Sequence, residues 1–185
     1  SVKGVITESK SGRRAFLAKN IIDATGDGDV AYFSGAPWQK GNEEGVTQGL
    51  TLRIRIGNIN FNRYFDWVEK NLEYYPKHTI ENIQIYRLKA ETGKEFYMSA
   101  DLSKLYSKYS HIEDLPFLSY FNGSSIRKNE MSLNCTRIYG LDGTKEEDLT
   151  KAEVICRKQS HALFNFLREH IPGFEDSVLT ETSTQ

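Results

Sequence analysis

The segment 50–56 places the tightest constraint on the fold, because its residues alternate strictly between two kinds of side chain. Leucine or isoleucine stands at positions 50, 52, 54 and 56, and Thr51, Arg53 and Arg55 stand between them. A period of two residues with one apolar face and one basic face predicts a strand that is buried on one side only. Arg53 and Arg55 are therefore expected on the face opposite the core.

Two other segments carry apolar residues three and four positions apart, which predicts amphipathic helices. The first covers residues 61–75 and stops at Pro76. The second is expected to start with Thr150 as its N-cap, because Glu153 is placed to complete a capping box. It ends at the Pro-Gly pair of residues 172–173.

Strand-like segments occupy much of the remaining chain. Residues 2–25 predict a hairpin that turns around Gly12, and residues 79–100 predict a second hairpin that turns at 91–94. The other expected elements are a strand over 131–140, a strand from residue 177, and coil with short helical pieces over 101–129. Strands and helices mix without regular β-α alternation, so the predicted fold class is α+β, with a mostly antiparallel sheet and packed helices.

Composition and charge exclude several classes of partner. With 24 basic and 25 acidic residues, the chain of 185 residues has a formal net charge of -1, so no global field recruits nucleic acid or an anionic membrane. No apolar run is long enough to cross a bilayer. Cys135 and Cys156 form no C-x-x-C pair and are expected to be buried free thiols. The four histidines show no metal-ligand spacing, and we expect no bound metal.

The stretch IIDATGDGDVAYFSGAP, residues 21–37, carries the clearest functional pattern. Its residues 26–31 satisfy G-x-G-x-x-A, the alanine-ended form of the dinucleotide-binding fingerprint. Residues 20–24 are expected to form the strand before it, and a helix is expected to begin at Asp29. The first free N–H groups of such a helix attract a phosphate.

Two other interpretations compete with nucleotide binding at this turn. Asp23, Asp27 and Asp29 bring three carboxylates close together, but the residues after them do not supply the ligand pattern of a calcium loop. Alternatively, Asp27 and Asp29 only cap a short helix while the glycines make the turn. On the local pattern alone, this structural interpretation and nucleotide binding are equally supported.

The same stretch resembles the late flavin-contacting segment of the FAD-dependent oxidoreductase family, which includes relatives of the fumarate-reductase and two-dinucleotide-binding-domain flavoproteins. NCTRIYGLDGT, DLTKAE and FLREHIPGFE, at residues 134–144, 148–153 and 166–175, are similar to the middle region of that family. The resemblance implies FAD as cofactor and a small molecule that is oxidised or reduced as substrate. It also implies cofactor contacts from Thr25, Gly26, Asp27, Gly28 and Asp29.

The resemblance assigns roles to the two parts of the chain. Residues 1–45 would form part of an FAD-binding lobe, and residues 46–185 a truncated substrate or cap region. Arg137 is the candidate catalytic residue on the substrate side, since a guanidinium binds a carboxylate or stabilises developing negative charge. The alternative for Arg137 is an arginine that ties down a loop.

The N-terminal glycine-rich fingerprint of the family, which holds the ADP half of FAD, does not occur in the sequence. We therefore expect an internal fragment that lacks N-terminal and C-terminal parts of its own chain. Alone, this fragment is expected to bind FAD weakly or not at all and to be inactive. The alternative function is a non-catalytic α+β binding module in which the glycine-acid turn is purely structural.

Overall fold

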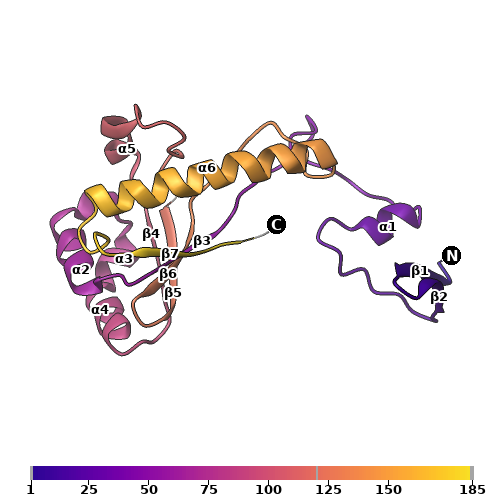
Figure 1. The fold of residues 1–185 in the computed structure, drawn as a ribbon, viewed down its shortest axis with the longest axis horizontal. Helices are drawn as coiled ribbons and strands as arrows, with labels where there is room; N and C mark the ends of the chain where they lie inside the picture. The colour runs from indigo at the N-terminus through magenta and orange to yellow at the C-terminus, as the bar shows by residue number, and fades with distance from the viewer. Residues whose placement is uncertain (1, 120, 184–185) are drawn as a thin grey trace. The chain divides into compact units, whose positions relative to one another are not determined.

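The computed structural model describes residues 2–119 and 121–183 and has an α+β fold (Figure 1). Its strands form a two-stranded sheet and a five-stranded sheet, and every pairing between strands is antiparallel. The predicted fold class is therefore confirmed. The chain divides into two compact units, Ser1–Thr47 (unit 1) and Gln48–Gln185 (unit 2).

Unit 1 contains a hairpin and one short helix. Strands β1 (Gly4–Ser9) and β2 (Gly12–Leu17) pair from Ser9 opposite Gly12 to Gly4 opposite Leu17, which confirms the predicted hairpin. Helix α1 (Asp29–Phe33) begins at the predicted residue. No described residue of unit 1 is buried.

The strand expected at residues 20–24 is wrong, because this segment has no regular structure. A strand needs a partner for its backbone groups, and the side chain of Asp23 instead binds nearby backbone N–H groups. The local hydrogen bonds of an aspartate compete in this way with a sheet ladder.

Unit 2 is built on the five-stranded sheet, whose strand order is β4-β5-β6-β3-β7. The strands are β3 (Ile54–Gly57), β4 (Phe96–Ala100), β5 (Phe121–Arg127), β6 (Glu130–Asn134) and β7 (Val178–Thr182). Strand β3 lies between β6 and β7 and pairs with both of them.

The alternation over residues 50–56 is confirmed where the segment becomes β3. Leu52, Ile54 and Ile56 are at most 1% exposed. On the other face, Arg55 forms ion pairs with Glu181 of β7 at 2.6 Å and with Glu130 of β6 at 3.5 Å. The regular strand starts only at Ile54.

The helices of unit 2 within the described residues are α2 (Phe61–Lys70), α3 (Lys77–Glu81), α4 (Ile83–Glu91), α5 (Ser103–Tyr109) and α6 (Glu146–His170), with a 3-10 turn at Leu72–Tyr74. Phe65 of α2 and Leu163 of α6 are completely buried and join the sheet residues Ile54 and Leu133 in one core. These aromatic and aliphatic side chains cover one face of the sheet.

The hairpin predicted over residues 79–100 is wrong in its first half, which forms α3 and α4 instead of a strand. Ile83 and Ile85 are two positions apart, as apolar residues of a strand are. In the structure, however, Ile83 and Ala90 are buried on one side of a helix. In its second half, Phe96–Ala100 is the strand β4, and it pairs with β5 rather than with the preceding segment. Tertiary packing decides between the two periods here.

Residues 101–129 contain the expected helical piece α5 and one strand that the sequence did not predict. Strand β5 has the sequence FNGSSIR, which is rich in residues that are typical of turns. Its position between β4 and β6 supplies hydrogen-bond partners on both edges, so pairing overrides its weak propensity.

Helix α6 begins one turn earlier than predicted. Lys145 is the N-cap, and the hydroxyl of Thr150 donates to the carbonyl of Glu146 inside the helix, so the capping box is wrong. Glu146, Glu147 and Asp148 form an acidic first turn, which the positive end of the helix dipole favours. The helix ends at His170, before the Pro-Gly pair, as predicted.

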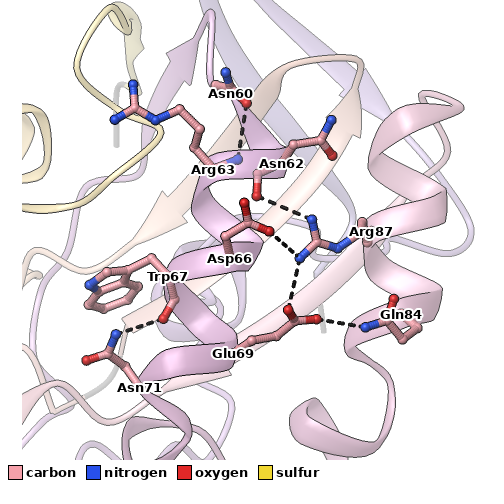
Figure 2. Close-up of polar contacts among 9 residues, drawn as sticks. All are labelled: Asn60, Asn62, Arg63, Asp66, Trp67, Glu69, Asn71, Gln84 and Arg87. Atoms are coloured by element: carbon pink, nitrogen blue, oxygen red, sulfur yellow. Dashed lines mark hydrogen bonds and ion pairs between the residues drawn. The ribbon is translucent and has the colours of Figure 1, made fainter.

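Arg87 joins α4 to α2 (Figure 2). Its guanidinium donates to the carbonyl of Asn62 at 3.3 Å and to Asp66 at 2.9 Å, and it lies 3.3 Å from a carboxylate oxygen of Glu69. It also lies 5.6 Å from the ring centroid of Phe65. These contacts orient α4 against α2 through a side chain that is only 20% exposed.

Replacing Arg87 by Met should lower the free energy of unfolding of unit 2 by about 1–2 kcal/mol, because two carboxylates and a carbonyl lose their donor. Chemical denaturation monitored by tryptophan fluorescence measures this change. Lys89→Met, on the same helix, is the matched control and should leave the midpoint unchanged. Equal midpoints for the two variants would show that Arg87 does not hold the helices together.

Candidate functional site

Asp23 organises the glycine-acid turn of unit 1. Its Oδ1 accepts from the N–H of Thr25 at 2.9 Å and from the hydroxyl of Thr25 at 2.7 Å, and its Oδ2 accepts from the N–H of Ala31 at 2.8 Å. The hydroxyl of Thr25, followed by these backbone donors, lowers the pKa of Asp23. The carboxylate therefore ties the segment before the turn to the first turn of α1.

The donors at the start of α1 are already used within the chain. Besides the bond from Ala31 to Asp23, the N–H of Asp29 donates to the hydroxyl oxygen of Thr25 at 2.8 Å. A phosphate at this helix start would have to displace a carboxylate and a hydroxyl. The phosphate site that the sequence pattern suggested for α1 is therefore disfavoured by the observed geometry.

The two glycines leave the outer side of the turn open. Gly28 has a φ of 73°, a left-handed conformation that suits glycine. A Cβ on Gly26 would meet no atom within 4 Å, and one on Gly28 would meet only Asp23 Oδ2 at 3.9 Å. Asp27 and Asp29 are exposed, and neither carboxylate accepts a hydrogen bond from the described residues. These carboxylates remain available as acceptors.

Arg137 lies in unit 2, three residues after the end of β6, and is half-buried. Its backbone is held by Gln159 of α6: Oε1 accepts from the N–H of Arg137 at 2.9 Å, and Nε2 donates to its carbonyl at 3.2 Å. A Cβ on Gly49 would lie 3.0 Å from the Cγ of Arg137, so the absence of a side chain there lets Arg137 pack closely. The position of Arg137 is therefore well defined.

The side chains of Thr51, Asn134 and Thr136, all before Arg137 in the sequence, form a hydrogen-bonded group. The hydroxyl of Thr51 lies 2.9 Å from Asn134 Oδ1 and 2.6 Å from the carbonyl of Thr136. The hydroxyl of Thr136 donates to the carbonyl of Leu52 and accepts from its N–H, both at 2.8 Å. These bonds replace regular strand pairing and explain why β3 starts only at Ile54.

Both cysteines are free and buried, as predicted. Burial raises the pKa of the Cys135 thiol to about 12 and also raises the pKa of Cys156. A thiol is reactive as its thiolate, so these residues serve packing rather than nucleophilic chemistry. Among residues 2–119 and 121–183, no three or more His, Cys, Asp or Glu residues are grouped as a metal site requires.

The sequence profile of the FAD dependent oxidoreductase family matches the chain from residue 1 to residue 185. The chain belongs to this family. The resemblance that the sequence motifs suggested is therefore confirmed, and FAD is the cofactor of the family. A search of the curated proteins gave no match, and neither did a search of the solved structures. None of the described helices has the length and apolar character that a membrane span needs.

For this flavoprotein, sequence reasoning missed two residues that organise the candidate site. The sequence pattern offers Asp23 only as one carboxylate of a calcium loop, although an aspartate two residues before a threonine is a common start of a local turn. Gln159 lies within the helix predicted to follow Thr150, and its own position in the sequence assigns it no role. Its contact with Arg137 joins residues 22 positions apart, and no local signal predicts it.

The turn should respond to acid through Asp23. The folded state lowers the pKa of this carboxyl, so its stabilising contribution is present above the unfolded pKa and is lost as the pH falls through the folded one. The amide shifts of Thr25 and Ala31 should change together at a pH below the ordinary aspartate pKa of about 3.9. Asp23→Asn should abolish this transition, and Asp27→Asn should preserve it. A common transition at or above the ordinary value would contradict the assignment.

Gln159→Leu should lower the free energy of unfolding by about 1–3 kcal/mol, because it leaves an N–H and a carbonyl of Arg137 without their partner. Hydrogen exchange at the Arg137 amide should become faster at the same time. Lys158→Leu, at the exposed neighbouring position of α6, is the control. Unchanged exchange at Arg137 in the Gln159 variant would show that the contact does not hold this segment.

Proposed function

We propose that the chain contacts the flavin nucleotide of an FAD-dependent oxidoreductase through its glycine-acid turn, and that a small molecule is oxidised or reduced at that flavin. The observation that carries the proposal is that some residues of the turn stabilise it while others remain available to a ligand. Asp23 and Thr25 hold the turn together. Gly26, Asp27 and Asp29 are exposed, and Gly28 leaves open space beside them.

The available groups suit hydroxyls better than phosphates. Asp27 and Asp29 offer carboxylate acceptors, and hydrogen bonds from hydroxyls to carboxylates are short and strong. FAD carries such hydroxyls on its ribityl chain and its ribose. Gly26 and Gly28 allow the cofactor to approach the backbone closely. Thr25 contributes by fixing the backbone of Asp29 rather than through a free hydroxyl.

Arg137 is proposed as the residue that contacts the substrate. A guanidinium binds a carboxylate in two-point fashion or stabilises developing negative charge. Gln159 and Gly49 fix the position of Arg137, and a fixed position is what a binding group needs to orient a substrate. The bound flavin would supply the transfer of electrons and hydride, and Arg137 would hold an anionic substrate group.

Under this proposal, the two parts of the chain have different tasks. Residues 1–45 belong to the flavin-contacting part, and residues 46–185 to the substrate or cap part. The compact units divide two residues later, after Thr47. None of the described residues of unit 1 is buried. Unit 1 would therefore contact the cofactor through an exposed surface. We therefore propose that the 185-residue chain alone retains FAD weakly and is inactive.

The glycine at position 28 provides the decisive test in the protein that carries this turn together with an ADP-binding fingerprint. Gly28→Phe should reduce the FAD retained after purification at least about tenfold, because the side chain occupies the open side of the turn. Gly35→Phe is the matched control, since Gly35 also has a positive φ, of 76°, and open space around it, but lies after α1. The flavin absorbance of the purified variants measures retention.

Two outcomes would overturn the proposal. If both glycine variants retain FAD equally, the turn does not contact the cofactor, and the non-catalytic binding module is supported. If the 185-residue chain mixed with excess FAD yields a stoichiometric yellow complex after gel filtration, the weak retention proposed for it is wrong. Asp27→Ala and Asp29→Ala, compared in the same assay, identify which carboxylate binds the cofactor.

A further inference from the structure

A polar pocket of about 460 Å³ opens where β3 ends and α2 begins. Four segments of unit 2 line it: residues 58–63, the end of α4 at 90–91, the β5–β6 turn at 128–129, and residues 173, 175 and 176 of the loop after α6. This volume lies within the range of small-molecule sites. The pocket is at the opposite end of β3 and β6 from Arg137, because Ile54 pairs with Leu133 at the Arg137 end and Ile56 pairs with Met131 at the pocket end.

The backbone holds these segments in a fixed arrangement. The N–H of Ile59 donates to the carbonyl of Asn129, and the N–H of Asn60 donates to the carbonyl of Gly173, both at 2.9 Å. Gly173 has a φ of 96°, and a Cβ there would lie 2.5 Å from the carbonyl oxygen of Asn60. The loop after α6 is thus packed directly against the start of α2. The pocket is preformed by main-chain contacts.

Several polar groups of the lining have no partner within the chain. Among the described residues, the ammonium of Lys128, the side-chain amides of Asn62 and Asn129, and the carboxylate of Glu91 take part in no hydrogen bond or ion pair. Arg87 binds the backbone carbonyl of Asn62 and leaves its side chain available, as Figure 2 shows. Donors and acceptors of both charges therefore remain unused.

The charge of the lining argues against a simple ion as ligand. Arg63 pairs with Glu175 at 2.8 Å, which leaves Lys128 opposed by the carboxylates of Glu91 and Asp176. A lone anion would meet these carboxylates, and a lone cation would meet Lys128. A hydroxyl group is uncharged and both donates and accepts, so it satisfies amides, carboxylates and an ammonium alike. Phe61 and Ala90 of the lining are buried and form the floor of the pocket, so the accessible lining is mainly polar.

We infer that this pocket binds a small polyhydroxylated molecule, of the size of a monosaccharide or a disaccharide. Its amides, its carboxylates and the ammonium of Lys128 complement neighbouring hydroxyls. The inference rests on the pocket alone and is independent of flavin binding at the turn of unit 1.

The test is an NMR titration of the isotope-labelled 185-residue protein with D-glucose and with maltose. At least one sugar should cause saturable shifts, in the millimolar range, at the backbone amides of Asn62, Asn129 and Gly173. Asn62→Ala should raise the dissociation constant about fivefold or more, because it removes one hydrogen-bonding group. Asn62→Trp should abolish the shifts by filling the pocket.

Asn62 is exposed on the first turn of α2, so both substitutions are compatible with folding. Lys70→Trp, at the exposed far end of the same helix, is the matched control and should bind like the parent protein. The inference is overturned if neither sugar causes saturable shifts, or if Asn62→Trp binds as tightly as the control. Shifts caused by inorganic phosphate and not by the sugars would also overturn it and would indicate an anion site.

Discussion

Burial of the apolar face of β3 is the interaction on which unit 2 depends. Ile54 and Ile56 of β3 and Leu52 just before it are at most 1% exposed, and full burial of such a side chain contributes about 1.5–3 kcal/mol. Because β3 pairs on both edges, its position fixes β6 and β7. Phe65 of α2 and Leu163 of α6 complete the core around Ile54 and Ile56. The Arg137 segment and the polar pocket lie at opposite ends of β3.

Unit 1 depends on hydrogen bonds rather than on a core. None of its described residues is buried, and the turn is held by the carboxylate of Asp23 and the hydroxyl of Thr25. These side chains occupy the donors that the dinucleotide fingerprint usually presents to a phosphate. The same residues that stabilise the turn therefore change what it is suited to bind. The carboxylates of Asp27 and Asp29 are the acceptors that remain, and the proposed function assigns them to hydroxyl groups of the cofactor.

The two candidate sites of unit 2 are positioned by contacts that are distant in the sequence. Gln159 of α6 holds the backbone of Arg137, and Gly173 packs against the start of α2. In the first case α6 contacts a segment next to the sheet, and in the second case the loop after α6 does so. A single long helix thus supports both ends of the sheet, and its placement determines the geometry of both sites.

The sequence by itself determined the elements whose pattern is local. It predicted the hairpin of unit 1, the alternating strand, the amphipathic helix after it, the start of α1 and the end of α6, because these depend on turn residues and on the side chains of one segment. The motifs also identified the FAD-dependent oxidoreductase family, since the glycine-acid turn is contiguous in the chain.

Only the tertiary structure decided the rest. The apolar residues of 79–91 fit the spacing of a strand and also that of a helix. The contact of Arg87 with α2 favours the helix. Strand β5 has weak intrinsic propensity and forms because β4 and β6 pair with it. The roles of Asp23 and Gln159 and the existence of the pocket depend on which side chains meet after folding. Distances between residues far apart in the chain are set by packing, and local periodicity carries no information about them.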